Sequence, residues 1–207
     1  MTGRAATERA ALADALTTVG PDAPTLCAGW TAADLAAHVY VREHRLDATP
    51  GVLPIGPWPK YTERVMRSAL RVHGFAALVE AIRTPALPLR VERIDDALNT
   101  VEMYVHTEDV RRANGMTQRE QPLSFEAAIW RRLSRQARLS FRRVQAAVTL
   151  SPSTAGAPIT VGKGGPAVTV TGRPSELLLL AYNRKDHAQV EIAGEGADAL
   201  RAAKLGA

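Results

Sequence analysis

The sequence predicts a mainly α-helical protein that ends in a small α+β part. Two observations lead to this fold class. Apolar residues recur at helical spacing through most of residues 1–146. Beyond residue 146 the chain is rich in Val, Thr, Gly and Pro, the composition of short strands joined by turns. The change of pattern predicts a helical domain over residues 1–146 and a small α+β domain over residues 147–207.

Start and stop signals mark the helices of the first part. Thr31 is expected to cap a helix, because Asp34 three residues later completes a capping-box pattern. Gly74 is expected to separate two shorter helices, and Asn114-Gly115 to end a long one. Stretches rich in Pro and Gly, such as residues 50–59, are expected to be loops. The predicted helices cover residues 4–19, 31–47, 61–72, 75–83, 94–113 and 124–146.

The second part alternates strand and turn signals before two closing helices. Proline at residue 174 favours the first turn of a helix, which the apolar run after it extends to residue 182. The glycine-rich segment 162–166 lacks the ending of a phosphate-binding loop, so it is interpreted as a hairpin turn. The predicted strands lie within residues 146–153, 158–161, 167–172 and 189–194, and the last helix covers residues 197–205.

The composition limits the classes of function. The chain has 207 residues and a formal net charge of +5, and no apolar run in it is long enough to span a bilayer. The first residues lack the apolar centre of a signal peptide, so a soluble, cytoplasmic protein is expected. The lone cysteine, Cys27, is interpreted as a small buried hydrophobic residue rather than a nucleophile.

Two helices carry ionisable residues at the margin of an expected apolar face. In the helix over residues 94–113, Glu102, His106 and Asp109 fall in a band beside that face. Ionisable groups are costly at the edge of a core unless they are paired or bind a metal. Glu102 and His106 are four residues apart, the spacing at which two helical side chains chelate one ion. The expected apolar face consists of Ile94, Leu98, Val101 and Val105.

A third ligand is available from the helix over residues 31–47. His38 and Arg42 lie at the edge of its apolar stripe, whereas His44 points the opposite way. Two imidazoles and one carboxylate suit zinc above all, and also nickel, iron or cobalt. Three protein ligands leave one coordination position open, as in catalytic zinc sites. Asp109 and Arg42 are candidates to orient a ligand or to bind a substrate.

These motifs resemble the metal-binding domain of the mycothiol-dependent maleylpyruvate isomerase family. The segments LCAGWTAADLAAHV, residues 26–39, and VEMYVHTEDVRRANG, residues 101–115, carry the resemblance. The family belongs to a DinB-like superfamily, so the resemblance implies an up-down four-helix bundle. It also implies that His38, Glu102 and His106 are the metal ligands. The residues that match the family pattern are Trp30, Thr31, Asp34, Leu35, His38, Glu102 and His106.

The resemblance extends to the segment GRPSELLLLAYNRKDHAQVEIAGEG, residues 172–196. In the family an arginine after the leucine-rich helix faces the active site, and Arg184 occupies that position here. The glycine that usually precedes it is replaced by Asn183. The resemblance implies that Arg184 faces the active site. With Arg42, which the helix position suggests, it is expected to hold carboxylates of the substrate, a role suited to planar guanidinium groups.

The resemblance further implies a thiol-dependent reaction. A low-molecular-weight, mycothiol-like thiol activated by the metal would act on a small electrophilic substrate, as in an isomerase or an S-transferase. The alternatives are a metal-binding protein without catalysis and a metal used only to stabilise the bundle. A nucleic-acid-binding protein is a further alternative, because arginines crowd the helix over residues 124–146, but a solvated helix face is preferred. The oligomeric state stays open.

Overall fold

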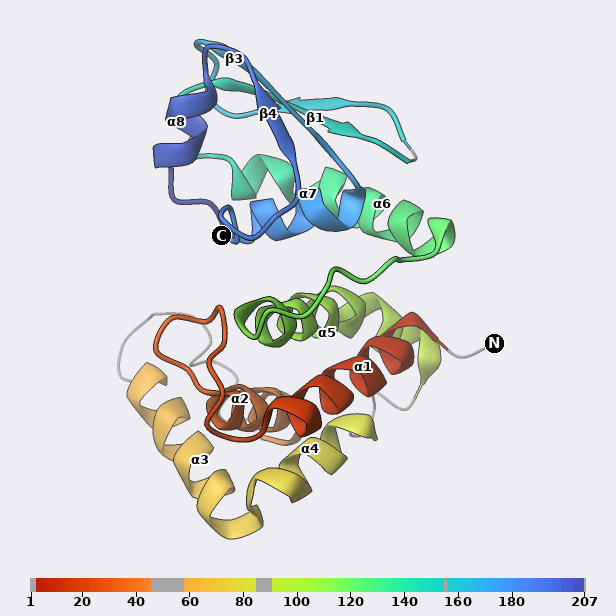
Figure 1. Ribbon diagram of the computed structural model, residues 1–207, viewed down its shortest axis with the longest axis vertical. Helices are drawn as coiled ribbons and strands as arrows, with labels where there is room; N and C mark the ends of the chain where they lie inside the picture. The colour runs from red at the N-terminus through yellow and green to blue at the C-terminus, as the bar shows by residue number, and fades with distance from the viewer. Residues whose placement is uncertain (1–2, 46–57, 85–90, 155, 207) are drawn as a thin grey trace. The chain divides into compact units, whose positions relative to one another are not determined.

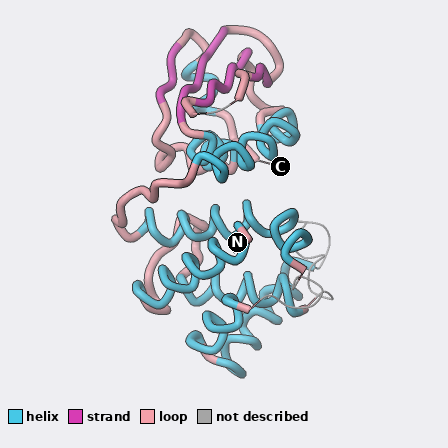
Figure 2. Tube along the Cα trace, turned by 90° about the vertical axis from the view of Figure 1, so that its right-hand side faces the viewer, coloured by secondary structure: helices cyan, strands magenta, loops and turns pink. Residues whose placement is uncertain are grey.

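The computed structural model describes residues 3–45, 58–84, 91–154 and 156–206. The chain divides into two compact units, Met1–Gln118 and Arg119–Ala207. Figure 2 shows that the strands all belong to the second unit, as the sequence predicts. No helix in the described parts of the chain is long and apolar enough to cross a membrane. The predicted loop at residues 50–59 lies outside the described residues up to residue 57, and its last two residues instead begin the helix Trp58–His73. The predicted loop marked by Pro85 and Pro88 also lies outside the described residues.

The first unit is a bundle of helices that confirms the predicted helical part. Helix α1 packs against α4 and α5, and α2 packs against α3 and α4 (Figure 1). Gly74, with a φ of 75°, separates α3 from α4 as predicted. The core includes Leu12, Leu16, Leu35, Val39, Leu78, Ile82 and Met103. The helices are α1 Arg4–Val19, α2 Ala32–His44, α3 Trp58–His73, α4 Phe75–Arg83 and α5 Glu92–Ala113.

A fully buried arginine joins four of these helices. Arg9 of α1 donates from Nε and Nη2 to the two carboxylate oxygens of Asp95 in α5, at 3.0 and 2.7 Å. Its Nη1 donates to Glu43 of α2 at 2.8 Å and to the carbonyl oxygen of Ile82 in α4 at 3.2 Å. Burial disfavours the charged guanidinium, but the hydrogen bonds to Asp95 and Glu43 outweigh it and raise the pKa of Arg9. We call this network of Arg9, Glu43 and Asp95 the arginine clamp.

The arginine clamp decides which face of α5 turns inward. The sequence placed Ile94 and Leu98 on the buried face, but their side chains are 40% and 56% exposed. That prediction is wrong, because Asp95 must reach Arg9 and therefore occupies the inner side of the helix. Asn99, one turn further, is buried as well and donates to Asp95 Oδ1 at 2.7 Å.

The second unit contains a four-stranded mixed sheet in the order β2-β1-β3-β4. Strands β1 and β3 are parallel, and the other neighbouring pairs are antiparallel. Helix α6 packs against α7, which lies against β1 and β3. Alternate strand residues are buried, namely Val148, Leu150, Val168 and Val170. The elements are α6 Leu123–Ser140, β1 Ala147–Pro152, β2 Ile159–Val161, β3 Ala167–Gly172, α7 Pro174–Ala181, β4 Glu191–Ala193 and α8 Ala197–Ala202.

Helix α6 belongs to the second unit, so the division falls near residue 118 and not near residue 146. The reason is a buried contact between α6 and α7. Glu126 of α6 accepts hydrogen bonds from the backbone N–H and the hydroxyl of Ser175, at 2.9 and 2.8 Å. It thereby satisfies the Ser175 amide, one of the groups that the first turn of α7 leaves without a helical partner. Helix α6 also ends at Ser140, earlier than the predicted residue 146.

Segment 162–166 is not a hairpin turn. It connects β2 to β3, and β1 lies between these two strands in the sheet. The antiparallel pair that is adjacent in sequence is β1 with β2, in which Val148 pairs with Val161. Local turn signals identified the loop correctly but carried no information about which strands it joins.

The arginine clamp predicts a large loss of stability when its cation is removed. Replacing Arg9 by Met keeps much of the side-chain volume but leaves the buried carboxylates of Asp95 and Glu43 without their cationic partner. The free energy of unfolding should fall by about 3–5 kcal/mol, measured by urea denaturation. Arg83→Met is the matched control, because Arg83 pairs with Asp14 at the surface. Similar losses in both variants would contradict a special role for the clamp.

Candidate metal centre

The first predicted ligand is held by a well-defined helix start. Thr31 and Asp34 form the predicted capping box: the Thr31 hydroxyl accepts from the Asp34 N–H, and the Asp34 carboxylate accepts from the Thr31 N–H. His38 follows two turns into α2, and its ring lies 4.9 Å from the ring of Trp30 at a tilt of 49°. The His38 imidazole is therefore positioned by helix α2 and by its contact with the Trp30 ring.

The structure brings the three predicted ligands together. Glu102 and His106 lie one turn apart on α5, and His106 Nε2 is 3.2 Å from Glu102 Oε1. His38 Nε2 from α2 is 3.7 Å from the same oxygen. One ligand atom from each residue lies within 4.8 Å of the other two. A tetrahedral ion with bonds of about 2.0–2.1 Å separates its ligand atoms by about 3.3 Å, so small side-chain adjustments would accommodate a divalent metal.

The other nitrogen of His106 is held by a carboxylate, as is usual for metal-binding histidines. His106 Nδ1 lies 3.1 Å from Asp109 Oδ2, and the Asp109 side chain is fully buried. In the neutral ring, a hydrogen bond from Nδ1–H to Asp109 leaves the lone pair of Nε2 directed toward Glu102 and His38. The predicted orienting role of Asp109 therefore has a geometric basis, and the donor set fits a divalent cation.

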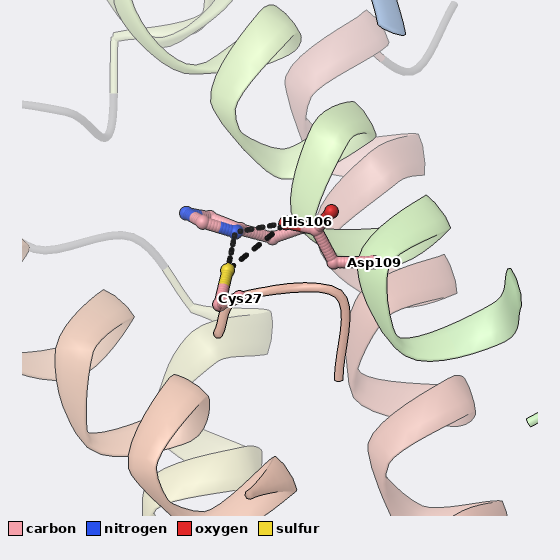
Figure 3. A group of neighbouring side chains, drawn as sticks. All are labelled: Cys27, His106 and Asp109. Carbon is pink, nitrogen blue, oxygen red and sulfur yellow. Dashed lines mark hydrogen bonds and ion pairs between the residues drawn. The ribbon is translucent and has the colours of Figure 1, made fainter. Parts of the chain in front are cut away.

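Cys27 also lies at this site, which the sequence interpretation missed. Figure 3 shows Cys27, His106 and Asp109 directed toward one another. Cys27 Sγ is 3.2 Å from Asp109 Oδ2 and 4.0 Å from His106 Nδ1. These three residues form a second possible group of metal ligands that shares His106 with the first. No sequence spacing indicated this, because Cys27 and His106 are 79 residues apart.

Arg42 lies beside the predicted ligands. Its Nε is 3.5 Å from Glu102 Oε1, and its Nη1 donates to Asn99 Oδ1 at 2.6 Å. Asn99 in turn donates to Asp95 of the arginine clamp. A continuous line of hydrogen bonds and ion pairs therefore runs from the clamp to Glu102. The sequence identified Arg42 but gave no indication of Asn99.

These contacts set the protonation states of the three predicted ligands. Burial lowers the pKa of His38, although the nearby Glu102 carboxylate opposes this effect. Burial alone would raise the pKa of Glu102, but the hydrogen bond with His106 and the nearby His38 hold it far below its usual range. Burial also opposes charge on His106, yet contacts with Asp109, Cys27 and Glu102 raise the pKa of His106 well above its usual value.

Arg184 follows α7 in the second unit. Its Nη1 donates to the carbonyl oxygen of Tyr182 at 2.6 Å. Asn183 before it has a φ of 66°, the left-handed conformation that favours glycine and that asparagine tolerates best among other residues. The Asn183 side chain also accepts from the Leu205 N–H at 3.0 Å. Asparagine can therefore replace the usual glycine here, and the role of Arg184 toward a substrate stays a prediction.

The fold and this side-chain cluster define a class of protein. It has a helical unit with a candidate site for a divalent metal and a second unit with a small mixed sheet. The fold resembles that in the crystal structure of the mycothiol-dependent maleylpyruvate isomerase, with a TM-score of 0.52 and 14% sequence identity. The match covers 98% of this chain and 93% of that one.

A histidine-to-alanine mutant of the same enzyme matches over the same shares, with a TM-score of 0.51 and 14% identity. No protein-family model and no curated protein sequence matches the chain. At this level of identity the likeness to the isomerase shows a shared fold.

The protonation states predict that metal binding releases a proton. At pH 7 the metal-free site holds an ionised Glu102, a neutral His38 and a protonated His106. Charged His106 stabilises the metal-free fold fully below about pH 6.5. This stabilisation is lost as the pH rises through the raised pKa of His106. A metal must displace this proton, so its affinity should increase with pH.

Calorimetric titration with zinc, in buffers of different ionisation enthalpy, should show release of about one proton at pH 7. His44→Ala should behave like the wild type, since His44 lies on α2 but is absent from both groups of possible ligands. Binding enthalpies that do not depend on the buffer would contradict the assigned state of His106.

Proposed function

We propose that this protein binds one divalent metal through His38, Glu102 and His106 and uses it in thiol-dependent chemistry. The observation that carries the proposal is that two imidazole nitrogens and one carboxylate oxygen from α2 and α5 converge within 4.8 Å. Zinc fits this donor set, as do nickel, iron and cobalt. The fold shared with a mycothiol-dependent isomerase supports the choice of a thiol as co-substrate.

An ion with these three protein ligands retains one open position for an exogenous ligand. When bound, the metal would lower the pKa of a coordinated low-molecular-weight thiol, such as mycothiol, so that the thiolate is present at neutral pH. The thiolate is the nucleophile needed to add to a small electrophilic substrate. If the thiolate adds to a carbon–carbon double bond of the substrate, rotation about the resulting single bond and loss of the same thiolate would give an isomerase. Protonation of the neighbouring carbon and retention of the carbon–sulfur bond would give an S-transferase.

The residues around the metal ligands have separate tasks in this proposal. Asp109 holds the His106 ring through Nδ1, and Arg42 contacts the ligating oxygen of Glu102. Arg42 is 23% exposed, so its guanidinium can also reach a carboxylate of the substrate. Arg184 is proposed to hold a second carboxylate, on the basis of the family resemblance around residues 172–196.

The metal assignment predicts stoichiometric binding that depends on these side chains. Mass spectrometry of the wild type should find about one equivalent of metal, and Glu102→Ala and His106→Ala should lose it. Asp109→Asn should retain the ligands but bind the metal about 10–100-fold more weakly. His44→Ala is the matched control and should stay loaded.

Circular dichroism distinguishes a catalytic metal from a structural one. A catalytic site should lose its metal while the helical signal is retained, because the arginine clamp and the apolar core hold the bundle. Unfolding on metal removal would favour the structural alternative. Absence of metal from the wild type after reconstitution would mean that His38, Glu102 and His106 form a buried polar network instead.

The thiol assignment predicts a metal-dependent thiolate. Alkylation of a bound low-molecular-weight thiol at pH 7 should be faster with the metal-loaded protein than with the metal-free protein. Arg42→Lys and Arg184→Lys should raise the KM for a carboxylate-bearing electrophile by about tenfold, because a lysine cannot form a bidentate contact. Arg201→Lys is the control, since Arg201 pairs with Asp198 at the surface of the second unit. Equal thiol reactivity with and without metal would refute this part of the proposal.

A further inference from the structure

The exposed face of α6 carries arginines that make no ion pair within the described part of the chain. Arg131, Arg135 and Arg138 follow each other at intervals of four and three residues, so they lie on one face of the helix. Arg142 continues this row just beyond the helix end. The residues within one turn of each of these arginines include other arginines but no Asp or Glu. Like charges at this spacing destabilise a helix. Arg138 lies in the last turn, where a cation suits the helix dipole, but helix stability does not explain Arg131 and Arg135.

The loop between β2 and β3 brings a further cation to the end of this row. Gly162 has a φ of 94°, and a Cβ there would lie 2.2 Å from the Ala146 carbonyl oxygen. The Lys163 N–H donates to the Val144 carbonyl oxygen at 3.1 Å. A glycine and a backbone hydrogen bond therefore fix the loop against the segment that follows α6.

Arg138, Arg142 and Lys163 line one open hollow with the backbone of residues 162–164 and with Thr160. We call it the basic hollow, and none of its lining residues is acidic. Arg142 donates from Nη1 to the Leu139 carbonyl oxygen at 3.1 Å, a contact that helps to end α6 and leaves its other N–H groups available. Ending the helix explains why an arginine stands at residue 142. It does not explain why Arg138 and Lys163 line the same hollow.

The chemistry of the basic hollow suits a compact anion of high charge. Two guanidinium groups and one ammonium group match the several oxygens of a phosphate, and each contact is a charge-assisted hydrogen bond. Thr160, whose hydroxyl is hydrogen-bonded to the Thr149 hydroxyl at 3.2 Å, and Gly164 complete the polar part of the lining. A single carboxylate would leave most of these donors unused.

We propose that the basic hollow binds the phosphate group of a small phosphorylated ligand. The convergence of Arg138, Arg142 and Lys163 on one hollow favours a compact group, because Arg131 and Arg135 continue along the helix outside it. A nucleic-acid backbone would present the same phosphate chemistry but would engage the whole row. Binding of a small phosphorylated ligand should therefore depend on Arg138 and Arg142, whereas binding of a nucleic acid should also depend on Arg131 and Arg135.

The test compares two variants of equal charge. The first removes the cations of the basic hollow, and the second removes arginines of α6 that lie outside it. Inorganic pyrophosphate is titrated calorimetrically at low ionic strength, and a labelled oligonucleotide is followed by fluorescence anisotropy over a range of salt concentrations. The substitutions are Arg138→Gln, Arg142→Gln and Lys163→Gln in the first variant, and Arg131→Gln, Arg132→Gln and Arg135→Gln in the second.

Pyrophosphate should bind the wild type and the second variant alike, and the first variant at least about tenfold more weakly. Circular dichroism checks the fold of each variant, and Arg138→Gln alone, on an exposed residue, serves if the triple variant does not fold. An equal loss in both triple variants would show attraction to net positive charge and would overturn the proposal. Failure of the wild type to bind pyrophosphate would also overturn the proposal. In that case, oligonucleotide binding that both variants weaken would assign the arginine face of α6 to nucleic acid.

Discussion

The arrangement of the candidate metal centre depends on the buried arginine clamp. A charged guanidinium without exposure to water is tolerated only when its donors are satisfied by well-placed acceptors. Arg9 meets this requirement with Asp95, Glu43 and a backbone carbonyl group, and so joins α1, α2, α4 and α5. Once Asp95 is directed at Arg9, the rotation of α5 about its axis is fixed. The positions of Glu102 and His106 follow from that rotation.

A polar stripe along α5 connects the arginine clamp to the candidate ligands. Its members recur every three or four residues and therefore share one side of the helix. Asn99 donates a hydrogen bond to Asp95 and accepts one from Arg42, and Arg42 contacts Glu102. Glu102 and His106 are thus each held by a neighbour that is itself hydrogen-bonded, which limits reorganisation when an ion binds. The stripe consists of Asp95, Asn99, Glu102, His106 and Asp109.

The second unit shows the same reliance on a few buried polar contacts. Glu126 attaches α6 to the start of α7, and Asn183 adopts the left-handed conformation needed after that helix. The fold of the whole chain resembles that of an isomerase with which it shares 14% identity. Backbone architecture tolerates wide sequence change when burial patterns and such contacts are kept. Chemistry depends on individual side chains, so it is the donor set at His38, Glu102 and His106 that supports a function.

The sequence alone determined the helical first part, the strand-rich second part and the candidate ligand pair on α5, because helical and strand periodicities are local and Glu102 and His106 are four residues apart. His38 was also identified from its place at the edge of an apolar helix stripe, and the family motif supported it as the third ligand. The tertiary structure decided which face of α5 is buried, that α6 joins the second unit, which strands the glycine-rich loop connects, and that Cys27 and Asn99 lie at the site. Each of these features depends on partners far apart in the chain: Arg9 and Asp95 are separated by 86 residues, and Glu126 and Ser175 by 49. Hydrophobic periodicity cannot report such pairs, since a buried ion pair can outweigh the apolar pattern that would otherwise orient a helix.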